Sequence, residues 1–220
     1  FQILCGLFLV VSYSSCMHSE EDKVDVLIIG GGASGVTSGI QSARMGANTL
    51  ILEESTWLGG MLTSAGVSAV DGNYRLPAGL WGEFKNRLSD YYGGLDSLKT
   101  GWVSNVLFEP SVGNKILHEM VAAENNLKVW KQACLEEVKR TGDEWVAKVK
   151  VEGQGVKTVR AKVMIDATEL GDVAKICGVK YDIGMESRDD THEDIAPEKK
   201  NNIVQDITYV AILKDYGKDV

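Results

Sequence analysis

The first regular pattern along the chain is a short apolar run that ends in glycines. Residues 24–29 are almost all β-branched or aliphatic, which is typical of a strand buried on both faces of a parallel sheet. Residues 33–45 place apolar side chains three and four positions apart and are followed by Gly46, which predicts a helix and its end. A second apolar run, 49–52, closes on Glu53. The pattern predicts a β-α-β unit with a right-handed crossover.

The pattern changes after the second strand. Residues 55–110 are rich in glycine and aromatic side chains and show little strand character, whereas an ordinary NAD domain would continue promptly with a helix and a strand. Within this region, residues 80–88 predict a short helix. Ser111 is placed to cap a further helix that runs through Ala123, because apolar residues form one face of that segment.

The strand pattern returns in the second half of the chain. Residues 128–138 predict one strand, which is followed by a turn at 141–143. Residues 145–151 and 156–162 alternate between apolar and polar, and the glycines between them predict a hairpin. Residues 163–165 again show the pattern of a buried strand. Together these patterns predict an α/β fold, a Rossmann-like dinucleotide-binding domain with a parallel sheet and a β-meander.

Composition and charge exclude some classes of function. The formal net charge is −8 and basic residues do not cluster, which argues against a nucleic-acid partner. The three histidines are far apart and lack acidic or cysteine neighbours at metal-ligand spacings, so we expect no metal site. Cys134 and Cys177 lie in apolar contexts, which favours two inert buried thiols over a redox pair.

The start of the chain has the pattern of an export signal. The apolar run 3–11 is too short to span a bilayer but suits the hydrophobic region of a secretory signal. The positive region and the initiator Met that normally precede such a run are missing, so we expect the sequence to be truncated at its start. Small polar residues up to Cys16, followed by a polar tether at 18–23, resemble the end of a bacterial lipoprotein signal. We therefore expect an exported protein, periplasmic or anchored to a membrane through a lipid on Cys16; the alternatives are a plain cleaved signal and a poorly ordered tail.

The glycines after the first strand form a dinucleotide-binding motif. In this context Gly30 would make the tight turn, Gly32 would let the backbone approach a diphosphate, and Gly35 would allow the helix to pack closely on the strand. The diphosphate would then meet free N–H groups at the positive end of the helix. Glu53, at the end of the second strand, is placed to accept hydrogen bonds from both ribose hydroxyls. A carboxylate there would repel the 2′-phosphate of NADP.

Several segments also resemble a known family. The glycines, Glu53 and residues 58–61 and 165–168 resemble the glutathione-reductase-like FAD-binding fold. More closely, residues 59–64, 81–84, 108–110 and 166–172 resemble a family of exported bacterial FAD-dependent oxidoreductases, and the likeness covers residues 24–220. The sequence is thus identified as an N-terminal fragment of such a protein.

The resemblance implies FAD as the cofactor and a role for individual positions. Ser34 would offer its N–H to the diphosphate, Gly59, Gly60 and Met61 would pass beside the ribityl chain and flavin, and Ala133 would face adenine. Asp172 matches an acidic position of the family, although Glu169 stands where many relatives have glycine. The predicted cofactor-binding residues are Gly30, Gly32, Ala33, Ser34, Gly35, Glu53, Gly59, Gly60, Met61, Ala133 and Asp172.

The resemblance also divides the chain into parts. Residues 1–23 would be the signal and its tether, and residues 24–180 the FAD-binding domain with an inserted region at 55–127. Residues 181–220 would begin an incomplete substrate domain.

These features predict an FAD-dependent oxidoreductase that transfers hydride between bound FAD and an unidentified small-molecule or carbohydrate-type substrate. Two alternatives stay open: an NAD-binding dehydrogenase or a lyase that retains a dinucleotide, and a non-catalytic flavin-binding surface protein. Asp71, Arg75 and Glu83 could face a substrate, but each is equally well explained as a surface or turn residue. The sequence identifies no catalytic residue.

Overall fold

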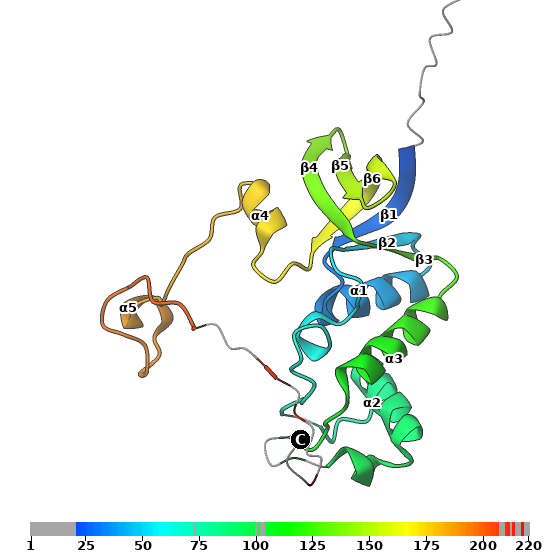
Figure 1. The fold of residues 1–220 in the computed structure, drawn as a ribbon. Coiled ribbons are helices and arrows are strands. Elements are labelled where there is room, and N and C mark those ends of the chain that lie inside the picture. Colours follow the sequence, from blue (N-terminus) through cyan, green and yellow to red (C-terminus); the bar gives the residue numbers. More distant parts are fainter. Residues whose placement is uncertain are drawn as a thin grey trace, which may run out of the picture.

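The computed structural model describes residues 21–72, 74–99, 101, 104–206, 210, 211, 213 and 217. These residues include a six-stranded sheet in the order β3-β2-β1-β6-β5-β4 (Figure 1). Three neighbouring pairs, β1 with β2, β1 with β6 and β2 with β3, are parallel, whereas β4, β5 and β6 form an antiparallel meander. The parallel sheet and the β-meander of the predicted α/β fold are therefore confirmed. The strands are β1 (Glu21–Ile29), β2 (Thr49–Glu53), β3 (Leu127–Lys131), β4 (Ala133–Thr141), β5 (Glu144–Val151) and β6 (Gly155–Asp166).

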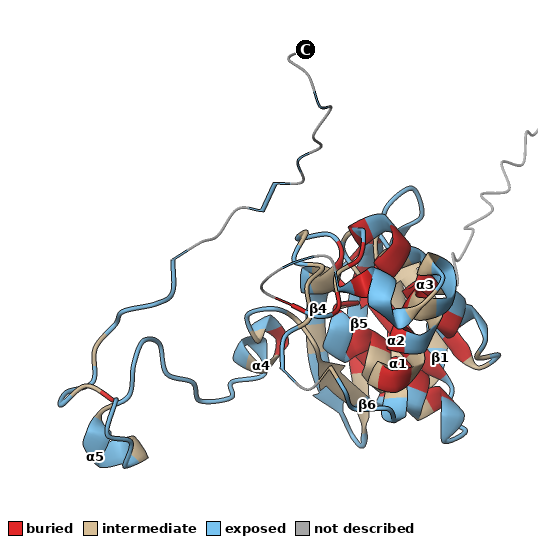
Figure 2. Cartoon of the chain, turned by 90° about the horizontal axis from the view of Figure 1, so that it is seen from below, coloured by how far each residue is buried: buried red, intermediate tan, exposed pale blue. Residues whose placement is uncertain are grey.

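Helices cover one face of the sheet and the meander curls over the other. Ile28 of β1 is fully buried among residues of the first three helices, which line one side of the sheet (Figure 2). Leu27 and Ile29 of the same strand pack on the opposite face, against Val149 and Ala161 of the meander. This alternation explains why the whole strand is apolar. The helical elements are α1 (Ala33–Arg44), η1 (Gly60–Leu62), α2 (Gly79–Tyr92), η2 (Leu95–Leu98), α3 (Pro110–Ala122), α4 (Asp172–Ile176) and α5 (Arg188–Thr191), where η denotes a 3₁₀ helix.

The first β-α-β unit forms where it was predicted, although β1 begins at Glu21, within the segment 18–23 that was expected to be a polar tether. Helix α1 ends at Arg44, and Gly46 follows with a φ of 91° in the left-handed region. After β2 the chain passes through η1, α2, η2 and α3 before it returns to the sheet as β3. The chain therefore does not pass from Glu53 through a single helix into the next strand, as in an ordinary NAD domain, but makes a longer connection between β2 and β3.

One strand prediction was wrong. Residues 128–138 do not form a single strand but belong to β3 and β4, which lie at opposite edges of the sheet. Gln132 separates them with a φ of 52°, a left-handed conformation that no strand can continue through. The chain then leaves β2 and pairs with β5 instead.

Two local predictions also need correction. Ser111 does not cap α3; Glu109 is the N-cap residue and Pro110 opens the helix, where its fixed φ is favourable and its missing N–H costs nothing. Cys134 and Cys177 are exposed free thiols rather than buried ones. Ala133 beside Cys134 is buried, but Cys134 itself lies on the edge strand β4, where the side chains alternate between the two faces. Cys177 follows the short helix α4, and its apolar neighbour Ile176 is exposed as well.

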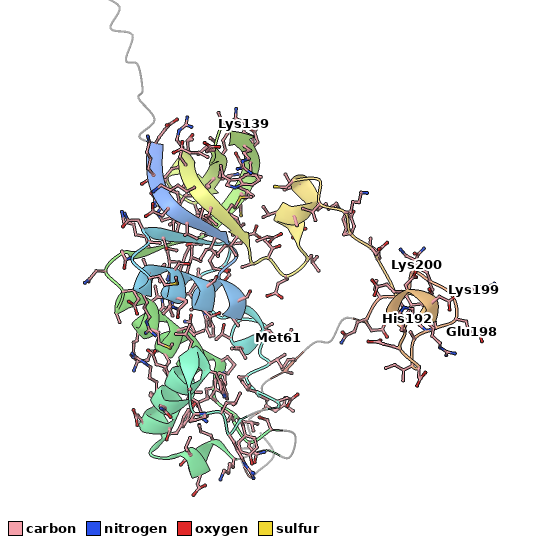
Figure 3. All side chains as sticks on the ribbon, turned by 180° about the vertical axis from the view of Figure 1, so that it is seen from behind. Met61, Lys139, His192, Glu198, Lys199 and Lys200 are labelled. Carbon is pink, nitrogen blue, oxygen red and sulfur yellow. The ribbon has the colours of Figure 1, made fainter. Side chains whose placement is uncertain are left out.

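The segment after α4 departs from the sheet. It runs out to α5, and His192, Glu198, Lys199 and Lys200 lie on this outlying part (Figure 3). Throughout the described part of the chain, no helix combines the length and the apolar character needed to cross a bilayer. The same residues include no group of three or more His, Cys, Asp or Glu side chains arranged to hold a metal ion.

Candidate functional site

A cleft opens beside the carboxyl ends of the neighbouring strands β1, β2 and β6. Its volume is about 290 Å³. Ligands of open α/β sheets bind at such an edge because the loops that follow parallel strands converge there. The cleft is lined by Ile29, Gly30, Gly31, Gly32, Leu52, Glu53, Glu54, Ser55, Gly60, Ser64, Ala133, Leu135, Ala167, Thr168, Glu169, Leu170 and Asp172.

Residues 30–35, the glycine turn, form the first wall. Gly30 has a φ of 103°, and a Cβ placed on it would lie 2.3 Å from the carbonyl oxygen of Ala167. A Cβ on Gly35 would lie 1.9 Å from the carbonyl oxygen of Gly30. Both positions therefore require glycine, because two other pieces of backbone approach them too closely for a side chain.

Gly32 is buried, but it differs from these two glycines because a Cβ there would not collide with backbone. Among the described residues outside its chain neighbours, the one atom within 4 Å of a Cβ on Gly32 is Oε1 of Glu169 at 3.5 Å. Gly32 is also the N-cap residue of α1, and neither a capping side chain nor an acidic residue in the first turn satisfies the N–H groups there. An uncapped helix end beside a glycine is a favourable site for a phosphate group.

The Glu53 carboxylate is held in place by two backbone groups. Its Oε2 accepts a hydrogen bond from the N–H of Gly31 at 2.7 Å, and its Oε1 accepts one from the N–H of Ser55 at 2.7 Å. Because a carboxylate has about four acceptor sites, each oxygen can still accept a hydrogen bond from a ribose hydroxyl. The side chain is thus positioned before any ligand arrives.

A second glycine pair is tied to the glycine turn. The N–H of Gly59 donates to the carbonyl oxygen of Gly31 at 2.8 Å, and a parallel bridge pairs Gly59 with Gly32. Gly59 and Gly60 have φ values of 108° and 53°, which favour glycine. This loop extends the wall of the cleft beyond Gly32.

Residues 167–172, the acidic loop, form an adjoining wall and are fixed by one side chain. Asp166, the last residue of β6, accepts hydrogen bonds from the N–H and the hydroxyl of Thr168 at 3.0 and 2.7 Å and from the N–H of Ala174 at 2.7 Å. Partial burial raises the pKa of Asp166, but these hydrogen bonds outweigh it and lower the pKa below its usual value. The carboxylate is therefore ionised and clamps both ends of the loop.

The structure brings together many of the predicted cofactor-binding residues. Six of them line the cleft: Gly30, Gly32, Glu53, Gly60, Ala133 and Asp172.

The other predicted residues do not line it. Ala33 and Ser34 are exposed in the first turn of α1, and Gly35 and Gly59 are buried behind the wall. Met61 lies on η1 with 58% of its surface exposed (Figure 3). The roles of all these residues toward a cofactor stay predictions.

Several lining residues were not predicted from the sequence. Gly31 and Ser55 donate hydrogen bonds to Glu53. Gly31 stands between the first two glycines of the motif and Ser55 lies two positions beyond the glutamate, and these positions could have indicated their roles. Thr168 and Leu170 also line the cleft, in the loop that Asp166 holds; they lie in the segment 166–172 that resembles the family, but no role was assigned to them from the sequence.

Glu83, a candidate to face a substrate, has a structural role instead. Its carboxylate pairs with Arg44 of α1 at 2.9 Å and with Arg87 at 3.2 Å. The hydrogen bond from Arg44 is the main reason that the pKa of Glu83 is lowered. Asp71 and Arg75 are exposed, and Arg75 lies over the ring of Tyr74.

The sequence that forms this cleft matches a known protein family. Residues 25–219 match the model of the family described as FAD dependent oxidoreductase. The chain belongs to this family. The predicted enzyme family and the predicted cofactor, FAD, are thereby confirmed. No curated protein matches the sequence.

Solved flavoprotein structures share the fold. The p-nitrophenol 4-monooxygenase PnpA from Pseudomonas putida DLL-E4 is 15% identical, with a TM-score of 0.51 over 76% of this chain and 46% of its own. A geranylgeranyl bacteriochlorophyll reductase-like protein from Thermoplasma acidophilum is 18% identical, with a TM-score of 0.50 over 81% of this chain and 49% of its own. The OxyS anhydrotetracycline hydroxylase from Streptomyces rimosus is 15% identical, with a TM-score of 0.52 over 74% and 36%. The chain thus matches less than half of each of these proteins.

The residues present fit an FAD molecule. The glycine turn leaves room for a diphosphate beside Gly32, and the uncapped end of α1 supplies N–H donors for it. Glu53 lies at the end of β2, where a carboxylate receives the ribose hydroxyls in folds of this kind.

Proposed function

We propose that the cleft binds the ADP part of FAD and that the protein transfers hydride between the flavin and an unidentified small-molecule or carbohydrate-type substrate. When bound, FAD supplies the two-electron redox chemistry, and the protein supplies binding and orientation. The glycine turn would receive the diphosphate and Glu53 the ribose. Ala133 and Leu135, on the far wall, would face the adenine.

The observation that supports this proposal most strongly is the pair of hydrogen bonds that fixes Glu53. A flexible surface glutamate would lose conformational entropy when it binds a ribose, whereas Glu53 already has its position set by Gly31 and Ser55. The same carboxylate disfavours a phosphate on the 2′-hydroxyl, which supports FAD or NAD over NADP.

The first experiment is a visible absorption spectrum of the purified protein, before and after denaturation, with the released compound identified by chromatography. A flavin spectrum and released FAD are expected. A colourless folded protein that ignores added FAD but binds NAD would contradict the proposal and favour the dehydrogenase alternative. A flavin that cannot be reduced and reoxidised would favour a non-catalytic flavin-binding protein.

A variant of Glu53 tests the binding geometry. Glu53→Ala removes both ribose acceptors, so the Kd for FAD is expected to rise by a factor of about ten or more, since a hydrogen bond to a charged group is worth about 1.5–3 kcal/mol. Glu119→Ala, which removes an exposed glutamate of α3, is the matched control. Unfolding curves of both variants show whether the fold is kept, and an unchanged FAD affinity in a folded Glu53→Ala protein would remove Glu53 from the site.

We also propose that the protein is an exported bacterial lipoprotein, attached to a membrane through a lipid on Cys16. Residues 1–20 lie outside the described part of the structure, so the support is the sequence pattern alone. We likewise propose, from the sequence alone, that the protein has no nucleic-acid partner, because its formal net charge is −8 and its basic residues do not cluster. Mass spectrometry of the mature N-terminus would test the anchor: an unmodified N-terminus at a residue other than Cys16 would contradict it.

A further inference from the structure

The carboxylate of Glu169 lies above the two glycines that would face a diphosphate. Its Oε1 is 2.9 Å from the position that a Cβ would take on Gly60 and 3.5 Å from that position on Gly32. Gly32 and Gly60 come from different loops, and the Cβ position on Gly60 is only 3.1 Å from the Cα of Gly32. The carboxylate therefore occupies space at the point where the two glycine loops meet.

The loop fixes the backbone of Glu169, but its side chain is unrestrained. Asp166 binds Thr168 on one side of Glu169 and Ala174 on the other, and the N–H of Asp172 donates to the Thr168 hydroxyl at 2.9 Å. Across the described residues, no hydrogen bond or ion pair holds the carboxylate of Glu169, which is exposed. The side chain can thus rotate toward solvent without losing a partner.

The other acidic side chains around the cleft add to the repulsion that a diphosphate would meet from Glu169. Four carboxylates line the cleft, those of Glu53, Glu54, Glu169 and Asp172, and the described lining residues include no Lys or Arg. A diphosphate would bring further negative charge into this environment and would meet no cationic side chain among the described lining residues. Glu169 is the carboxylate that lies over Gly32 and Gly60, so its repulsion of a diphosphate would be the strongest.

We propose that Glu169 is a built-in competitor of the cofactor diphosphate. Its carboxylate occupies the entry to the diphosphate position in the free protein and must swing into solvent when the cofactor binds. This arrangement lowers the affinity for FAD and slows its entry. The inference rests on the proposed function, because it assigns the diphosphate to the space beside Gly32.

The test compares the Kd of FAD, ADP and adenosine for the 220-residue chain and for E169Q, which keeps the size of the side chain but removes its charge. Calorimetry measures FAD and ADP, and NMR titration measures adenosine. E169Q is expected to bind FAD and ADP about three- to tenfold more tightly, the size of effect expected for one nearby exposed charge. The affinity for adenosine, which has no phosphate, should stay within twofold. The gain for FAD should shrink at high ionic strength because salt screens exposed charges.

E54Q is the matched control. Glu54 lines the same cleft but interacts with the Cys134 thiol on the β4 side. Neutralising it removes the same charge from the cleft, but at a position that is not beside Gly32 and Gly60, so its effect on FAD affinity should be clearly smaller than that of E169Q.

The outcomes separate this inference from the proposed function. Wild-type protein that binds FAD with an affinity equal to or higher than that of E169Q would overturn the role of Glu169 and leave the FAD site in place. An equal gain in E54Q, or an equal gain for adenosine, would also overturn it, because either would mean a general charge effect. If neither protein binds FAD or ADP while both are folded, the proposed function and this inference fail together.

Discussion

Two loops form adjoining walls of the cleft, and they reach their positions by different means. The glycine turn follows β1 and the acidic loop follows β6, and these strands are neighbours in the sheet, with Ile29 paired to Asp166. The glycine turn is shaped by the absence of side chains, since a Cβ on Gly30 or Gly35 would collide with backbone. The acidic loop is shaped by one side chain, Asp166, whose hydrogen bonds hold both of its ends.

The difference shows that a binding wall can be specified locally or through the tertiary structure. A turn that requires glycine leaves a pattern that can be read in the sequence. A loop held by a carboxylate leaves only an aspartate, a residue that is common at strand ends and in turns. The two loops nevertheless depend on each other, because the Ala167 carbonyl is the group that excludes a side chain from Gly30.

The largest expected effect comes from adding a side chain at the point where the two loops touch. Gly30→Ala would place a Cβ 2.3 Å from the carbonyl oxygen of Ala167, and Gly30 also has a positive φ. Gly46→Ala is the matched control, because Gly46 has a similar φ of 91° and a Cβ there would meet nothing within 4 Å. We expect the control to lower the free energy of unfolding by about 1 kcal/mol and Gly30→Ala by more than about 3 kcal/mol.

Urea unfolding followed by circular dichroism measures both variants. Equal losses of stability would mean that only backbone strain matters at Gly30 and that the two loops are not in tight contact.

A smaller effect is expected when the acidic loop is released. Asp166→Asn keeps the size of the side chain but turns one acceptor into a donor that faces the N–H of Ala174. We expect a loss of about 1–2 kcal/mol in the free energy of unfolding and faster amide exchange at Ala174 and Thr168, with little change in the glycine turn. Asp172→Asn is the control, because the Asp172 side chain is exposed in the same loop. If amide exchange in the glycine turn rises as much as in the acidic loop, the two walls form one cooperative unit.

The smallest expected effect is the pH dependence of that same interaction. The pKa of Asp166 in the folded protein is below its ordinary value of about 3.9. The stabilisation is therefore fully present above about pH 4 and is lost as the pH falls through the folded pKa. The difference in unfolding free energy between wild type and Asp166→Asn should be constant near neutral pH and should shrink below about pH 4. Comparing the two proteins at each pH cancels the contribution of the other carboxylates, which titrate in both. A difference that does not change with pH would show that the charge of Asp166 does not contribute to stability.

Much of the fold could be predicted from the sequence because it depends on local patterns. The apolar run of β1, the helix that ends before Gly46, Glu53 at the end of β2 and the 152–155 turn are all specified by neighbouring residues. The prediction failed at Gln132, where one continuous strand pattern is divided between two edges of the sheet. That break depends on which strands accept β3 and β4 as partners, and single-sequence periodicity does not contain this information.

The sequence by itself determined the β-α-β unit, its glycine turn and the acidic residue at the end of β2, because sterics and the period of the apolar side chains act over a few residues. Only the tertiary structure decided what stands beside that turn. The crossing from β3 to β4 brings Ala133 into the cleft, the pairing of β1 with β6 brings the acidic loop against Gly30, and the position of Glu169 above Gly32 and Gly60 follows from that pairing. These contacts join segments that are far apart in the chain, and their geometry depends on strand order and on the burial of both sheet faces, which no short segment of sequence contains.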